Sequence, residues 1–252
     1  MMSDELYEHE VEEENYFVSM TDMMVGLVFI FILLLMYYAL QFRDVTEQLT
    51  GADRTRTEIL EQLQSSLKEK GVDVTIDTQN GILRLPDAIL FDSGKAELKD
   101  DGHWAVGRLS EALASVLPCY SDYASAAAVR PVGCPPTPHR IESLYIEGHA
   151  DSDRLTGSGL LKDNWDLSVV RATNTFRELI AAKPDLTIYC AKKYRSCEPI
   201  LSVSGYGPDR PIDPADTTEA KQKNRRIDLR IIMMTPDNGE TATALREELE
   251  QQ

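Results

Sequence analysis

One carboxylate stands alone inside a long apolar run near the N-terminus. Residues 17–40 read FVSMTDMMVGLVFIFILLLMYYAL, and Asp22 is the single charged residue among these 24. A carboxylate at the centre of a membrane-spanning helix costs about 2.5–3.5 kcal/mol, so it indicates a functional group by default. Because a carboxyl group can alternate between charged and neutral forms, Asp22 is our candidate for ion relay. The alternative is that Asp22 lies at the headgroup boundary, near the start of the run.

A second pair of charged residues falls on two neighbouring elements. SLYIEG (143–148) predicts a strand that runs into GHAD, so Asp151 follows a strand end, where a loop can present it. Arg171 lies on a helix predicted from about Asn164 to Ala182. Such a pair could hold the ammonium and the carboxylate of a zwitterionic ligand, because a guanidinium matches a carboxylate in shape and charge. The alternative is an ordinary ion pair beside a solvated helix.

The helix that carries Arg171 divides into two faces when residues are placed at about 100° intervals. We expect one face to pack in the core and the other, mostly polar face to lie apart from it. The expected core stripe is Trp165, Val169, Ala172, Thr173, Phe176 and Ile180, and the polar face is Asn164, Leu167, Ser168 and Arg171.

The sequence favours no catalytic or nucleic-acid-binding function. It contains no nucleophile elbow, phosphate loop or H-E-x-x-H pattern, and His149 has no nucleophile beside it, so we interpret it as structural. With 26 Lys and Arg against 42 Asp and Glu, the net charge is -16, which opposes binding to nucleic-acid phosphates. We therefore expect neither an enzyme nor a bound metal or cofactor, and no nucleic-acid partner.

The four cysteines all follow the apolar run and form two local pairs. The intervals are 15 and 7 residues and there is no C-x-x-C, so zinc binding is disfavoured. Of the three possible pairings we prefer the local one, Cys119–Cys134 with Cys190–Cys197. Disulfides form in oxidising compartments, which would place the C-terminal part in the periplasm and residues 1–16 in the cytoplasm. Four reduced, buried cysteines are the alternative.

The elements that must position these groups begin with the apolar run. At about 1.5 Å per residue it spans roughly 36 Å, enough for the hydrocarbon core of a bilayer. It is too long, and its flank too acidic, for a cleaved signal peptide. Residues 1–16 carry seven carboxylates and no Lys or Arg, so the positive-inside rule does not support a cytoplasmic N-terminus. We expect one retained transmembrane helix.

The rest of the chain predicts a small sheet with helices on one face. Strands are expected at 72–77 and 82–86 around the Asn80-Gly81 turn signal, and at 143–148, 199–207 and 225–233. Helices are expected from Asp100 and from Asn164, and residues 118–140 form a loop-like insertion. This order predicts an α+β fold, an α/β sandwich after one transmembrane helix. The expected parts are an acidic tail (1–16), the transmembrane helix (17–40), a helical linker (41–71), the sandwich domain (72–234) and a second acidic tail (235–252).

Several segments of that domain resemble one family in the expected order. GHAD, NWDLSVVRA (164–172) and NRRIDLRI (224–231), with LPDAILFDSGKAEL (85–98), resemble the peptidoglycan-binding domain of the OmpA/MotB family over residues 72–234. The resemblance implies that Asp151 and Arg171 hold the diaminopimelate of a cell-wall stem peptide, with Asn164 and Leu167 beside them. Ala150 replaces the usual Thr, and residues 152–163 are longer than usual, so the mouth of the pocket would differ.

The N-terminal part resembles the B subunits of ion-driven motors, whose single helix carries an Asp near its cytoplasmic end. This implies a single-pass protein of the bacterial inner membrane, a homodimer inside a ring of multi-span A subunits. The acidic tail and the cysteine-bearing insertions are most similar to the B subunits of Zorya anti-phage systems. The alternatives are a flagellar stator subunit and a structural cell-wall tether that conducts no ion.

Overall fold

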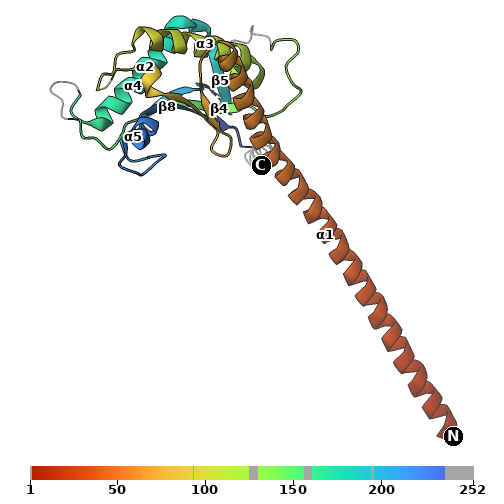
Figure 1. Cartoon of the computed structure of the whole chain (residues 1–252). Helices are drawn as coiled ribbons and strands as arrows, with labels where there is room; N and C mark the ends of the chain where they lie inside the picture. The colour runs from red at the N-terminus through yellow and green to blue at the C-terminus, as the bar shows by residue number, and fades with distance from the viewer. Residues whose placement is uncertain (1, 93, 125–129, 156–160, 194–195, 236–252) are drawn as a thin grey trace. The chain divides into compact units, whose positions relative to one another are not determined.

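The computed structural model describes residues 2–92, 94–124, 130–155, 161–193 and 196–235 (Figure 1). The chain divides into two units, Met1–Thr50 and Gly51–Gln252, and each is described by itself. Parts of three segments discussed above lie outside the described residues: 125–129 of the insertion, 156–160 of the connection after Asp151, and 236–252 of the acidic tail.

The helix α1 (Met2–Glu69) contains both the apolar run and the segment that follows it. Its stretch Met20–Arg43 is long and apolar enough to cross a membrane, judged by length and composition alone. In the second unit, the end of α1 contributes to the hydrophobic core through Ile59, Leu60, Leu63 and Leu67. The compact unit therefore begins at Gly51, and part of the segment expected as a linker packs with the domain.

A mixed sheet of five strands forms the centre of the second unit, in the order β1-β2-β8-β4-β7. β4 and β7 are parallel, and the other neighbouring pairs are antiparallel. The turn signal at Asn80-Gly81 joins β1 and β2 as predicted, with Gly81 at φ 70°. The strands are β1 (Thr75–Asp77), β2 (Ile82–Pro86), β4 (Ile141–His149), β7 (Leu201–Gly205) and β8 (Arg226–Met233).

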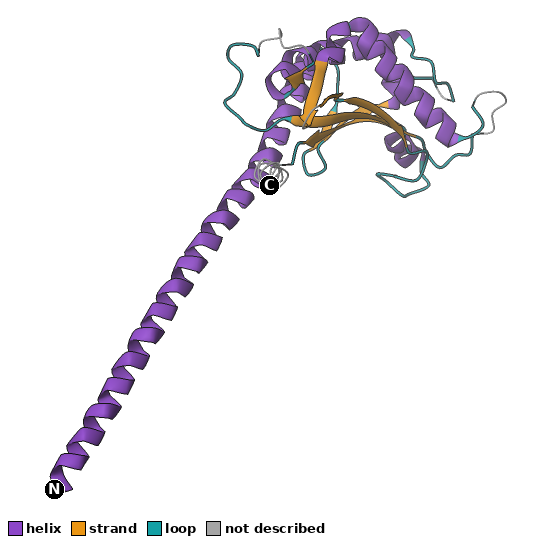
Figure 2. Cartoon of the chain, turned by 180° about the vertical axis from the view of Figure 1, so that it is seen from behind, coloured by secondary structure: helices purple, strands orange, loops and turns teal. Residues whose placement is uncertain are grey.

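Helices cover one face of this sheet, which confirms the predicted α+β class. α3 (Asp100–Tyr120) and α4 (Asn164–Ala182) lie on the same side of the sheet, and the short α5 (Thr218–Asn224) lies on its other side (Figure 2). Side chains alternate along the strands, so that apolar residues face the helices and charged residues the opposite side. In β4 and β8 the apolar set is Leu144, Ile146, Ile227, Leu229 and Ile231.

The smaller elements lie around this sandwich. α2 (Asp87–Leu90) follows β2 directly, and a 3-10 helix (Pro184–Ile188) follows α4. A second sheet, not expected from the sequence, has the order β3-β5-β6. Its strands are β3 (Asp122–Tyr123), β5 (Tyr189–Lys193) and β6 (Ser196–Pro199).

The predicted core stripe of α4 is largely wrong. Trp165 and Val169 are 45% and 43% exposed, whereas all four residues of the expected polar face are buried. The reason lies in two glycines of the sheet. A Cβ on Gly148 would lie 2.0 Å from the backbone oxygen of Ser168, and one on Gly205 would lie 2.7 Å from the backbone nitrogen of Val169. The helix therefore approaches the sheet backbone closely along the face that includes Ser168 and Arg171.

Both disulfides join the cysteines that are neighbours in sequence. Cys119–Cys134 connects the end of α3 to the insertion, and Cys190–Cys197 bridges β5 and β6. The local pairing predicted from the intervals is confirmed, and the alternative of four reduced cysteines is wrong.

Candidate functional site

Four charged side chains meet where β4 ends, and they come from four different segments. Asp151 follows β4, Arg171 lies on α4, Asp87 begins α2, and Arg225 lies between α5 and β8. Arg225 Nη1 donates to Asp151 Oδ2 at 2.5 Å, and Arg171 Nη1 lies 2.8 Å from Asp87 Oδ1. Arg225 Nε lies 4.0 Å from Asp87 Oδ2, which joins the two pairs. We call these four residues the charge cluster.

The loop that carries Asp151 is held by Asn164, the first residue of α4. Asn164 Nδ2 donates to the backbone oxygens of Asp151 at 3.0 Å and Asp153 at 2.8 Å. Its Oδ1 accepts from the backbone N–H of Leu155 at 3.2 Å. Asp163 caps the helix by accepting from two backbone N–H groups, so the helix start and the loop are fixed together. Asn164 is therefore a positioning residue for the carboxylate of Asp151.

Arg171 is among the largest fully buried side chains, with 1% of its surface exposed. Its Nε donates to the backbone oxygen of Lys95 at 2.8 Å and its Nη2 to that of Asp92 at 3.2 Å. The guanidinium also lies 4.9 Å from the centroid of the Phe91 ring. These contacts leave Asp87 as its charged partner in the cluster, and Leu167 lies buried on the same helix.

Burial affects the ionisation of Asp87 in the charge cluster. Burial raises the pKa of Asp87 to about 6, although the charges of Arg171 and Arg225 oppose that shift. Asp87 therefore changes its charge near neutral pH while lying against a buried arginine. A cluster of two carboxylates and two guanidinium groups can exchange its internal partners for the ammonium and carboxylate of a zwitterion.

The structure brings Asp151, Asn164 and Arg171 together, with Leu167 buried on the helix of Arg171, but it pairs the charged residues differently. Asp151 and Arg171 lie in one cluster without a direct ion pair, since each contacts another charged residue. Sequence reasoning missed Asp87 and Arg225 as members. Their place in the cluster follows from the pairing of β2 with β8, which brings the residues at the ends of these strands together. The backbone N–H of Asp87 donates to the backbone oxygen of Arg225 at 3.2 Å.

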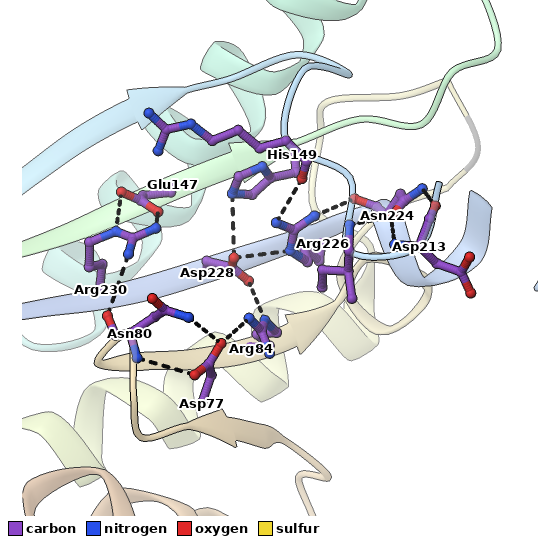
Figure 3. Close-up of polar contacts among 12 residues, drawn as sticks. Asp77, Asn80, Arg84, Glu147, His149, Asp213, Asn224, Arg226, Asp228 and Arg230 are labelled. Atoms are coloured by element: carbon purple, nitrogen blue, oxygen red, sulfur yellow. Dashed lines mark hydrogen bonds and ion pairs between the residues drawn. The ribbon is translucent and has the colours of Figure 1, made fainter. Parts of the chain in front are cut away.

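A separate group of charged residues lies on the face of the sheet away from α4 (Figure 3). Glu147, His149 and Asp228 offer three possible metal ligands whose atoms lie within 4.8 Å of one another. The carboxylates of Glu147 and Asp228 both already pair with arginines. Arg230 donates twice to Glu147, at 2.8 Å each, and Arg226 Nε donates to Asp228 Oδ2 at 3.0 Å.

This arrangement does not suit a cation. Arg84 Nε lies 3.8 Å from Asp228 Oδ1, so three guanidinium groups surround two carboxylates. Burial, aided by the positive charge of Arg226, lowers the pKa of His149 to about 3, which keeps its ring neutral. Burial also raises the pKa of Asp228 to about 6. We interpret the group as a structural layer of ion pairs, in line with the structural role expected for His149.

Asp22 belongs to the first unit, so the structure does not place it relative to the charge cluster. It is the third residue of the apolar stretch Met20–Arg43. This position is near one end of the stretch and fits both the ion-relay hypothesis and the headgroup alternative.

Comparison with known proteins gives one curated relative and several similar folds. No family model matches the chain. It is 27% identical to motility protein B of Bacillus subtilis (strain 168) over 187 residues, which cover 72% of this chain and 58% of that protein. The chain thus spans about 58% of the length of this relative.

Three solved structures resemble the chain at lower sequence identity. One is a MotB-like protein from Desulfovibrio vulgaris (TM-score 0.49, 19% identity, 72% of this chain and 97% of that one). Another is the periplasmic domain of Helicobacter pylori MotB (TM-score 0.45, 20% identity, 66% and 85%). A third is the cell wall anchor of the T6SS from Pseudomonas aeruginosa (TM-score 0.47, 18% identity, 71% and 99%).

Proposed function

We propose that this chain is the peptidoglycan-anchored B subunit of an ion-driven motor in the bacterial inner membrane. The observation that carries the proposal is the charge cluster, which complements a zwitterion and occurs in a chain with one apolar stretch fit to cross a membrane. The similarity to motility protein B supports the same conclusion. The chain acts by binding and anchoring and carries out no enzymatic reaction.

In the wall-binding step, the ligand is the diaminopimelate of a stem peptide, whose side-chain end carries an ammonium and a carboxylate on one carbon. The ammonium binds Asp151, and the carboxylate binds the guanidinium groups of Arg171 and Arg225. Both arginines have carboxylate partners in the free protein, so the ligand replaces internal ion pairs. Asn164 holds the loop in place while this exchange occurs.

In the membrane step, Asp22 takes up and releases the driving ion, a proton or a sodium ion. The partner is a ring of multi-span A subunits around a homodimer of this chain. Because both cysteine pairs are oxidised, we orient the second unit to the periplasm and the N-terminus to the cytoplasm.

Among motors of this kind, we favour one that serves defence against phage. The acidic N-terminal tail and the two disulfide-bearing segments support this choice over a flagellar stator subunit. The other candidate is a structural tether, in which Asp22 lies at the headgroup boundary near the end of the apolar stretch and relays no ion.

Wall binding is tested by co-pelleting the full-length protein, in detergent, with purified peptidoglycan sacculi. Asp151→Asn should lower binding by about tenfold or more, because a hydrogen bond to a charged group contributes about 1.5–3 kcal/mol. Asp153→Asn is the matched control, since Asp153 is exposed and pairs with Lys221 outside the cluster. Unchanged pelleting of Asp151→Asn would refute the assigned site.

Arg171→Ala is a poorer test, although the sequence alone suggests it. Removing one partner of a buried ion pair typically costs about 3–5 kcal/mol of stability. Arg171 is buried with three polar contacts, so this variant would lose binding through unfolding as well.

A further inference from the structure

A cavity of about 510 Å³ lies between the start of the sheet and α5. Arg84 and Pro86 of β2 form one wall, and Ile212 and Lys223 form the opposite one. Arg225 also lines it, so the cavity borders the charge cluster. None of the wall-binding steps above uses this space.

The charge of the lining selects the kind of ligand. Four lining residues are cationic, Arg84, Lys223, Arg225 and Arg226, and the one lining carboxylate is Glu219. Each of the four has a carboxylate partner outside the lining: Asp77 for Arg84, Asp213 for Lys223, Asp151 for Arg225 and Asp228 for Arg226. A ligand anion would therefore share these cations with internal carboxylates. The buried Arg84 Nε has no hydrogen-bond partner among the described residues. An anionic group entering the cavity would meet donors of several arginines and one lysine.

The apolar part of the lining limits the size and type of the group that carries the charge. Leu85, Pro86 and Ile212 contribute hydrocarbon surface, and Ile212 is 44% exposed. A short aliphatic residue with a free carboxylate would cover this surface and place its charge among the cations.

Arg225 connects the cavity to the charge cluster. Its Nη1 donates to Asp151, while its side chain is 31% exposed and lines the cavity. A ligand held at Asp151 would therefore lie beside a residue that lines the cavity.

We propose that this cavity is a second subsite for the cell-wall peptide, one that binds the terminal D-alanine carboxylate following diaminopimelate. The inference rests on the proposed function, because it needs diaminopimelate at the charge cluster. The subsite makes the protein selective for stems of four residues over stems of three.

The test is calorimetric titration of the full-length protein in detergent with two purified muropeptides, disaccharide tripeptide and disaccharide tetrapeptide. Both stems end in one free carboxylate, and only that of D-alanine lies one residue beyond diaminopimelate, at the cations of the cavity. The wild type should therefore bind the tetrapeptide about fivefold more tightly, the gain expected of one partly exposed ion pair. Lys223→Glu reverses a charge in the cavity, and Ile212→Trp fills it. Either should bring the affinity ratio close to one. Lys192→Glu, an exposed change of equal charge on β5, should keep the wild-type ratio.

The outcomes separate this inference from the proposed function. A wild type that binds both peptides equally would refute the subsite and leave the charge cluster as the wall site. Cavity variants that keep the wild-type ratio would refute it as well. A wild type that binds neither peptide would overturn the proposed function and the subsite together.

Discussion

At the scale of single residues, the charged groups of the charge cluster pair with one another. Asp87 forms an ion pair with Arg171, and Asp151 forms one with Arg225, so each arginine already has a carboxylate partner within the protein. The ligand must compete with Asp87 for the buried arginine. Since burial raises the pKa of Asp87 to about 6, protonation weakens this competitor in a range where the ligand carboxylate remains charged.

We predict that sacculus binding strengthens as the pH falls from 7.5 to 5.5. Below its pKa of about 6, Asp87 becomes neutral and releases Arg171 to the ligand. Asp87→Asn should remove this dependence, which co-pelleting at both pH values will measure. Wild-type binding that weakens over the same interval would contradict the role of Asp87.

The ionisation of Asp87 also changes the stability of the fold. Between its usual pKa of 3.8 and about 6, Asp87 binds more protons in the folded state than in the unfolded one. Its contribution to the free energy of unfolding therefore decreases as the pH rises through that window. The pKa of Asp228 is also raised to about 6, so thermal unfolding reports both groups and only the Asp87→Asn comparison separates them.

At the scale of elements, local patterns predicted the long helices and the main strands, but not the face on which α4 packs. Its bounds, Asn164–Ala182, agree with the prediction because Asp163 caps it and Pro184 follows it. Its buried face depends on Gly148 and Gly205, which belong to the strands β4 and β7 and not to the helix itself. Side-chain polarity on the helix carries no information about such a backbone approach.

Local patterns also failed to predict the second sheet and two residues of the charge cluster. In the second sheet, β5 reads YCAKK and does not alternate, and β3 (DY) and β6 (SCEP) contain too few apolar residues to show a pattern. Asp151 and Arg171 were found from local motifs. Asp87 and Arg225 join them only through the pairing of β2 with β8, which local motifs do not specify.

Gly148→Ala should destabilise the domain by about 1–3 kcal/mol, the usual cost of forcing extra volume into a packed interior. The new Cβ would lie 2.0 Å from the backbone oxygen of Ser168, which cannot move without shifting α4. The matched control is Gly107→Ala in α3, where a Cβ meets no atom within 4 Å. That change should stabilise the helix by about 0.5–1 kcal/mol. Urea unfolding of both variants measures the difference, and equal stabilities would contradict the close approach.

At the scale of the whole molecule, the proposed motor needs two separate attachments, one to the wall and one to the ion path. The charge cluster lies in the second unit and Asp22 in the first, so the two functions can be lost separately. A variant without wall binding should still conduct ions at Asp22, and a variant without the carboxylate should still bind the wall.

We predict that Asp22→Asn keeps the protein in the membrane with its partner and abolishes its action. Asn resembles Asp in size and inserts more easily, but it cannot ionise near neutral pH. Asp22→Glu should be the milder change because the carboxylate remains. The measurement is phage protection, or motility for a flagellar subunit, in cells that express each variant at equal levels. Full activity of Asp22→Asn would contradict ion relay and leave the structural tether as the remaining function.

The pattern of the disulfides has a consequence for how the protein matures. The first cysteine pairs with the second and the third with the fourth. As the chain emerges into the periplasm in the proposed orientation, each pair can close before the next pair arrives. Oxidation in order of emergence then yields the native bridges, so biogenesis requires a thiol oxidant but no disulfide isomerase. Cells without the isomerase should accumulate the native bridges at the wild-type level, which mass mapping of the purified protein would establish. A bridge between Cys134 and Cys190 in those cells would show that reshuffling is needed after all.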